Sequence, residues 1–156
     1  MPAFQLFDDP LPSHPPFDIS VSAGAVVSFD GRVRDHNENR SVSGLAYSAY
    51  PVLALSEGDR IVVEAIARFG LQAAACFHRL GDLALGDVAV RVWAVAAHRE
   101  EAFAGCRYIL DEVKVRVPIW KKETYVDGQS EWVMCTHLDD RTPGDQLRKV
   151  VVPRIF

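Results

Sequence analysis

The chain has 156 residues, of which 49% are hydrophobic, and its formal net charge is −4. This length fits a single domain that can bury a core of ordinary size. An acidic chain is not expected to bind nucleic acid or membrane surfaces in general, and no apolar run approaches the roughly 18 residues that a membrane span needs.

The N-terminal part of the chain predicts two strands. Residues 3–7 are β-prone, and a proline-rich connector follows, because proline fixes φ and donates no hydrogen bond. Residues 24–29 predict an inner strand that ends at the turn signal Asp30-Gly31. The polar residues 32–40 predict a loop, in which Arg34 is either a solvated charge or part of an anion site.

The middle of the chain changes from strand to helical spacing. Residues 42–50 alternate between two faces and predict a strand that Pro51 closes. From residue 54 to residue 69 the apolar spacing is helical, and Gly70 stands where a C-terminal cap is expected. Gly58 weakens this helix by about 1 kcal/mol relative to alanine, so the sequence does not define where the helix begins.

Two further strands lead into a second helix. Residues 73–79 predict a strand that carries His78, which is either a ligand or, in the interpretation that we favour, a structural histidine. Residues 87–97 predict the most regular strand, and a helix follows from Arg99 to about residue 116. Free amides and the dipole at a helix start attract anions, so His98 and Arg99 are candidates for an anion site. Alternatively, His98 only caps this helix or packs against it.

Lysine is concentrated in one short segment. The chain has four lysines against thirteen arginines, and Lys114, Lys121 and Lys122 lie within ten residues of one another. A partly buried lysine can lose its proton and act as a base or nucleophile, whereas arginine stays protonated. Lys114 lies about 20° from the apolar stripe of its helix, on the rim of the buried face. The segment therefore predicts a reactive site, although lysines near a helix end can also merely complement the dipole.

A small β unit follows the second helix. Pro118 ends the helix, and residues 119–126 predict a strand that carries Lys121 and Lys122 on opposite faces. A turn then leads to a returning strand over residues 130–135.

The order of the elements indicates an α+β fold, with a mixed sheet, two main helices and a small β subdomain. We expect one catalytic domain over residues 1–135 and an extension of unknown role over residues 136–156. No metal-binding or cofactor-binding motif occurs, so neither a metal nor a cofactor is expected. The cysteines are odd in number and far apart, and no secretion signal is visible at the N-terminus, so we expect a cytoplasmic protein with reduced thiols.

The candidate site residues are mostly cationic. They are Arg34, His98, Arg99, Lys114, Lys121 and Lys122, and Arg116 is a further possibility. Positive groups are costly to bring together unless an anion binds among them, so we expect a substrate with a phosphate or a carboxylate.

Four segments carry a resemblance to a known family. They are Phe29-Asp-Gly-Arg-Val-Arg34, Phe77-His-Arg-Leu-Gly81, Ala97-His98-Arg99 and Lys114-Val-Arg-Val-Pro-Ile-Trp-Lys-Lys-Glu123. In order and spacing they resemble the large, catalytic subunit of molybdopterin synthase, the MoaE family, over roughly residues 20 to 133. The chain departs from the family at Ser48, where a glutamate is usual, and in the more apolar segment 51–55.

The resemblance implies an α/β hammerhead fold with an added β subdomain. It also implies sulfur transfer from the C-terminal thiocarboxylate of a small ubiquitin-like subunit to cyclic pyranopterin monophosphate (precursor Z), which forms the dithiolene of molybdopterin. The family assembles as a dimer of large subunits with a small subunit at each end, a heterotetramer. Carried over by motif, Lys114 and Lys121 are the catalytic candidates. The substrate and tail site would also be lined by Arg34, His98, Arg99, Lys122 and Glu123, and Phe29 would shape it.

Two other interpretations of the lysines stay open at this point. One is an enzyme that forms a Schiff base through Lys114 or Lys121 with a phosphorylated carbonyl substrate. The other is a non-catalytic scaffold that binds anions. If sulfur comes from a partner subunit, none of the three cysteines need be catalytic.

Overall fold

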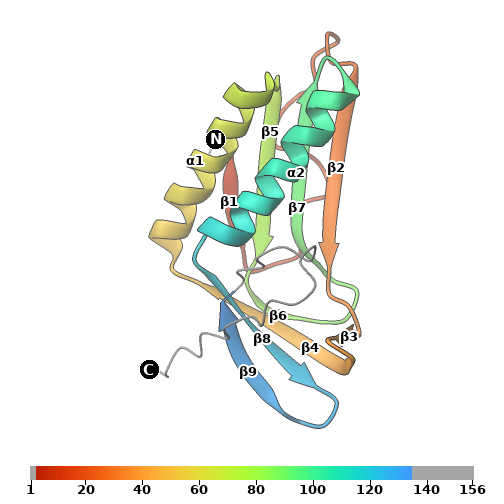
Figure 1. Cartoon of the computed structure of the whole chain (residues 1–156), viewed down its shortest axis with the longest axis vertical. Helices are drawn as coiled ribbons and strands as arrows, with labels where there is room; N and C mark the ends of the chain where they lie inside the picture. The colour runs from red at the N-terminus through yellow and green to blue at the C-terminus, as the bar shows by residue number, and fades with distance from the viewer. Residues whose placement is uncertain (1–2, 135–156) are drawn as a thin grey trace, which may run out of the picture.

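The computed structural model describes residues 3–134. Two helices cover one face of a four-stranded sheet, and a second sheet lies beyond one end of these elements (Figure 1). This arrangement confirms the expected α+β class with two main helices and an added β subdomain. Cys135 and the predicted extension over residues 136–156 lie outside the described residues.

The four-stranded sheet is mixed. Its strands are β1 (Phe4–Phe7), β5 (Ala73–Arg79), β7 (Val88–Ala96) and β2 (Ala25–Arg32), in that order across the sheet. β1 runs parallel to β5, and the other pairs are antiparallel.

The prediction of an inner strand over residues 24–29 was wrong, because within residues 3–134 β2 pairs only with β7 and forms an edge of this sheet. The strand also continues through Asp30-Gly31 to Arg32, where a turn was expected. The carboxylate of Asp30 accepts hydrogen bonds of 2.6 and 2.7 Å from Arg91 on β7. This cross-strand ion pair holds the segment in the sheet against its turn propensity.

The helices are α1 (Pro51–Phe69) and α2 (Arg99–Arg116). α1 begins at Pro51 and not near residue 54, because proline fits the first helical turn, where an N–H has no partner. It ends as predicted at Gly70, which has a φ of 63°. Packing explains the glycine at position 58, since a Cβ there would overlap the ring of the fully buried Phe4.

The main core lies between the helices and the sheet, and its buried members are apolar. They include Phe4, Ile61, Val62, Ala65, Val92, Ala94, Ala102, Ile109, Val113 and Ile119. A smaller cluster around Phe77 and Trp93 lies on the other face of the sheet, where Phe7, Leu11 and Phe17 pack against it.

The second sheet is antiparallel. It contains β3 (His36–Asn37), β4 (Arg40–Ala49), β8 (Ile119–Tyr125) and β9 (Ser130–Met134), and β6 (Gly81–Leu83) pairs with β4. The predicted loop over residues 32–40 therefore contains a short strand. Glu38 and Asn39 both have positive φ angles, 48° and 62°, between β3 and β4, which is the requirement of a tight two-residue hairpin.

Candidate functional site

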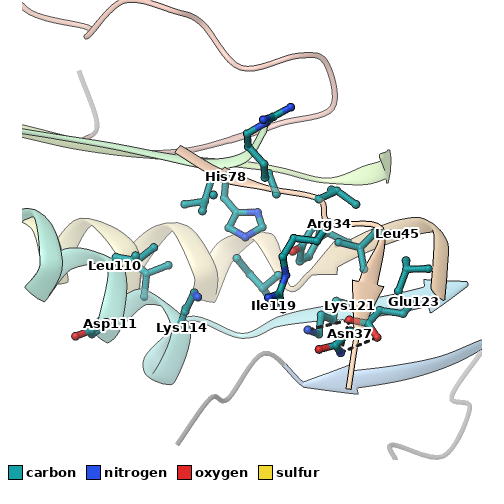
Figure 2. A pocket seen from close by; sticks show the side chains of 18 of the residues that line it. Arg34, Asn37, Leu45, His78, Leu110, Asp111, Lys114, Ile119, Lys121 and Glu123 are labelled. Carbon is teal, nitrogen blue, oxygen red and sulfur yellow. Dashed lines mark hydrogen bonds and ion pairs between the residues drawn. The ribbon is translucent and has the colours of Figure 1, made fainter. Parts of the chain in front are cut away.

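A cavity of about 750 Å³ lies where the C-terminal half of α2 meets β4, β8 and the segment after β2. Arg34, Lys114 and Lys121 all line it, together with His78 and Glu123 (Figure 2). Its size suits a small-molecule substrate. Four of the residues predicted from the sequence to share a site, Arg34, Lys114, Lys121 and Glu123, are therefore brought together.

Arg34 and Lys114 are exposed cations at this cavity. Within residues 3–134, neither side chain has an ion pair or a hydrogen bond to a protein group. Lys114 lies on the last turns of α2, directly after the buried Val113. Unpaired cations at the mouth of a cavity can bind a phosphate or carboxylate without breaking an interaction within the protein.

Lys121 differs because it is anchored. Its Nζ lies 3.2 Å from Oε1 of Glu123, and the lysine side chain is only 16% exposed. Glu123 is itself buried and accepts hydrogen bonds from Nδ2 of Asn37, at 2.9 and 3.0 Å, and from the hydroxyl of Tyr125, at 2.7 Å. Burial alone would raise the pKa of Glu123, but these hydrogen bonds and the charge of Lys121 lower it overall. The network therefore keeps the Glu123 carboxylate ionised and fixes the position of the Lys121 side chain beside it.

His78 lies in the wall of the same cavity. It is buried, its Nδ1 is 2.8 Å from the backbone oxygen of Arg79, and its ring meets that of Tyr47 edge-on at 4.8 Å. Burial, with a smaller contribution from the charge of Lys114, lowers the pKa of His78 to about 4. Nδ1 has a hydrogen-bond partner, as expected for a structural histidine. The sequence did not predict that the residue also lines the cavity. The motif Phe77-His-Arg-Leu-Gly81 was the available signal.

The cavity of one chain does not include His98 and Arg99. They begin α2, whereas Lys114 lies near its other end, and an 18-residue helix is about 27 Å long. Both residues are exposed at the start of the helix. The structure therefore does not bring His98 and Arg99 together with Lys114 within one chain, because the helix that connects them also separates them.

Three further candidates also lie away from the cavity. Lys122 is on the opposite face of β8 from Lys121, with its Nζ 5.9 Å from the ring centre of Trp132. Arg116 pairs with Glu57, Glu64 and Glu112. Phe29, on β2, is 37% exposed and does not line the cavity.

The described cysteines are expected to be unreactive. Cys76 and Cys106 are free and buried, and burial raises the pKa of both thiols, that of Cys106 to about 11. Such thiols hold little thiolate and are poor nucleophiles. Among residues 3–134, no group of three or more His, Cys, Asp or Glu side chains is placed to hold a metal ion. In the same part of the chain, no helix is long and apolar enough to cross a membrane.

Known proteins resemble this chain in sequence and in fold. It is 46% identical over 110 residues to the molybdopterin synthase catalytic subunit of Pyrococcus abyssi, covering 70% of this chain and 74% of that one. The protein of the same name from Emericella nidulans is 42% identical over 113 residues, 72% of this chain, and the match spans only 58% of its length.

Two solved structures share the fold. A molybdopterin synthase structure from Staphylococcus aureus has a TM-score of 0.78 and 31% identity, over 85% of this chain and 97% of that one. A complex of subunits 1 and 2 of the molybdopterin-converting factor from Helicobacter pylori has a TM-score of 0.58 and 21% identity, over 78% and 75%, and shows the fold alone. The model of the MoaE protein family matches residues 13–116, and the chain therefore belongs to the MoaE family.

Proposed function

We propose that the chain is the catalytic subunit of a molybdopterin synthase. It would transfer sulfur from the C-terminal thiocarboxylate of a small ubiquitin-like subunit to precursor Z, forming the dithiolene of molybdopterin. The observation that carries this proposal is the cavity that joins Lys114, Lys121 and Arg34 in a chain whose relatives bear this name.

The charges of the cavity support an anionic substrate. The whole chain has a net charge of −4, yet Arg34 and Lys114 both line the cavity and have no carboxylate partner in the described part of the chain. Precursor Z carries a phosphate, and the tail of the small subunit ends in a thiocarboxylate. Both groups gain from a local concentration of positive charge.

The two lysines have different surroundings, which suggests different roles. Lys114 is exposed at the cavity and has no ion pair within the described residues. It can therefore approach the thiocarboxyl carbon and assist sulfur transfer, as a base or by stabilising the developing charge. Lys121 is held by the Glu123 carboxylate, so it suits a fixed cation that holds the phosphate or protonates a leaving oxygen.

His98 and Arg99 can enter this mechanism through a second copy of the chain. Within one chain, α2 separates them from Lys114, and both are exposed. In the proposed homodimer they would line the cavity of the partner. Mixing Lys114→Ala with Arg99→Ala subunits tests this, because a mixed dimer would then hold one intact site. Activity regained on mixing is expected, and two inactive variants that stay inactive when mixed would contradict the shared site.

Reconstitution tests the function itself. Purified protein, thiocarboxylated small subunit and precursor Z should give a dithiolene product, and Lys114→Ala should abolish it while binding of the small subunit survives. Undiminished turnover would end the assignment of Lys114. A substrate adduct trapped by borohydride on either lysine would favour a Schiff-base enzyme, and absence of turnover in the wild type would favour a scaffold.

The thiols bear on where the protein works. Cys76 and Cys106 are buried and free, which supports the expectation of a reducing, cytoplasmic compartment. The partner subunit supplies sulfur in the proposed reaction, so these thiols need no chemical role.

A further inference from the structure

We propose that His78 is a substrate-binding residue that accepts a hydrogen bond from the heterocycle of the substrate, on the wall of the cavity that faces Lys114. This inference deepens the proposed function and rests on it. It assigns the heterocycle and the phosphate of the substrate to different parts of the cavity.

The first step is the tautomer of His78. Its Nδ1 lies 2.8 Å from the backbone oxygen of Arg79, and a carbonyl oxygen can only accept. Nδ1 therefore carries the hydrogen, and Nε2 of the neutral ring carries the lone pair. The residue is only 7% exposed and its ring lies edge-on to that of Tyr47, so the orientation of the ring is fixed before a ligand arrives.

The second step is the protonation state. The cavity already holds Arg34, Lys114 and Lys121, and a further positive charge there is disfavoured. Burial and the charge of Lys114 both lower the pKa of His78, so the ring is neutral near pH 7. A neutral ring with a bare Nε2 has no hydrogen to offer to a phosphate oxygen from this atom.

The third step is the place of this acceptor in the cavity. Arg34, Lys114 and Lys121 can only donate hydrogen bonds. The carboxylate of Glu123 already accepts from Asn37, Tyr125 and Lys121. Figure 2 shows the ring of His78 pointing into the cavity, with Lys114 on the facing wall. A group that lies between them is placed to donate to His78 and to accept from Lys114.

A fully ionised phosphate cannot do both, because its oxygens only accept. A heterocycle with adjacent N–H and C=O groups can, and so can a hydroxyl. Pterins have such an N–H and C=O edge. His78 thus fits the pterin end of precursor Z, while Arg34 and Lys121 remain for its phosphate.

Two substitutions separate the acceptor from the scaffold role of the ring. His78→Asn can keep the hydrogen bond to the Arg79 carbonyl, because its amide nitrogen reaches the position of Nδ1, but it removes the acceptor. His78→Gln can place an amide oxygen near the position of Nε2. We expect His78→Asn to raise KM for precursor Z about 10- to 100-fold with a smaller change in kcat. We expect His78→Gln to stay within about threefold of the wild type, and small-subunit binding to survive in both.

A spectroscopic readout covers the case in which a variant fails to fold. In protein with ¹⁵N-labelled histidine, the unprotonated Nε2 of His78 should give a signal that moves when precursor Z is added. Inorganic phosphate, which binds only through the cationic groups, should leave this signal in place. A protonated Nε2, or a signal that phosphate moves as much as precursor Z does, would overturn the inference.

The inference and the function fail in different ways. Wild-type turnover with an unchanged KM in folded His78→Asn would overturn the inference and leave the function standing. A wild-type protein without turnover, when both substrates are supplied, would contradict the function and the inference with it.

Discussion

The core between the helices and the four-stranded sheet differs in composition from the walls of the cavity. Between the four-stranded sheet and the helices, the buried residues are apolar, from Phe4 to Val113. The second sheet and its border with the first hold the two buried polar side chains of the described residues, His78 and Glu123. Both of these line the cavity. The buried members of the core are therefore apolar, whereas the cavity holds polar groups where a ligand can reach them.

The difference has an energetic basis. Buried apolar side chains stabilise the fold by about 25 cal/mol for each Å² removed from water, whatever their partners. A buried carboxylate destabilises it unless hydrogen bonds and a counter-charge compensate. Glu123 has both, from Asn37, Tyr125 and Lys121. A network of this kind is expected where function requires a charge. The predictions below test whether the apolar core serves stability and the polar cavity serves function.

After the complete loss of product expected from Lys114→Ala, the largest effect is expected from Lys121→Ala. Lys121 and its neighbour Lys122 stand on opposite faces of β8, and only Lys121 lines the cavity. Loss of a fixed cation that stabilises developing charge should lower turnover about 100- to 1,000-fold, or about 3–4 kcal/mol. Lys122→Ala is the matched control and should stay within a few-fold of the wild type. Equal losses in the two variants, measured in the reconstituted reaction, would contradict the assignment of the cavity.

The pH dependence of stability should report the buried histidine. The pKa of His78 is about 4 in the folded chain against 6.5 in the unfolded chain, so the unfolded state binds more protons between these values. The free energy of unfolding should therefore fall as pH falls from 6.5 to 4, by about 3 kcal/mol from this group. Above pH 6.5 the contribution is constant.

Denaturant unfolding at several pH values measures this effect. His78→Gln is the control, because it cannot titrate there and should show a flatter profile between pH 6.5 and 4. The lowered pKa values of Glu123 and Asp30 act in the same direction at lower pH, and both variants share them. Parallel profiles of wild type and His78→Gln would show that His78 is not buried as a neutral ring.

Gly58→Ala tests the apolar region. By helix propensity alone the change should stabilise α1 by about 1 kcal/mol. The new Cβ would overlap the ring of Phe4, which is fully buried between α1 and the sheet. We therefore expect a net loss of about 2 kcal/mol in the free energy of unfolding.

Ser56→Ala, at an exposed position of the same helix, is the control for Gly58→Ala and should be neutral or slightly stabilising. Turnover of folded Gly58→Ala protein should be unchanged, since Gly58 does not line the cavity. A gain of stability in Gly58→Ala would mean that Phe4 moves aside easily.

The sequence predicted the apolar region better than the edges of its elements. The regular alternation of residues 87–97 and the helical spacing of residues 54–69 follow from local periodicity, and both were confirmed. The edge position of β2 depends on which strand pairs with it. The hairpin at Glu38 and Asn39 depends on two positive φ angles at residues that need not adopt them. Neither feature has a local signal.

The site was predictable where its residues follow from the motif and from strand or helix spacing. Lys114 and Lys121 flank the junction of α2 and β8, so their proximity follows from the sequence between them. Tyr125 meets Glu123 because residues two apart on a strand share a face. Asn37 meets Glu123 only because the β3–β4 hairpin lies beside β8, a pairing between distant segments. His98 and Arg99 begin the helix that carries Lys114 near its other end, so sharing a helix does not bring these residues together within one chain.

The smallest effect is expected from Arg116→Lys, which tests whether every cation of the lysine-rich segment serves the cavity. Arg116 lies two residues after Lys114, but its guanidinium donates to Glu57 and Glu64 on α1 and to Glu112 on its own helix. These hydrogen bonds raise the pKa of the guanidinium and connect α1 to α2. A lysine keeps the charge but cannot reproduce the forked geometry, so Tm should fall by about 3 °C, and turnover should be unchanged.

Arg107→Lys is the control. The exposed ion pair between Arg107 and Asp111 is 3.5 Å long, so this change should leave Tm almost unchanged. If Arg116→Lys instead lowered turnover without lowering Tm, the cationic site would extend beyond the cavity to the surface between α1 and α2.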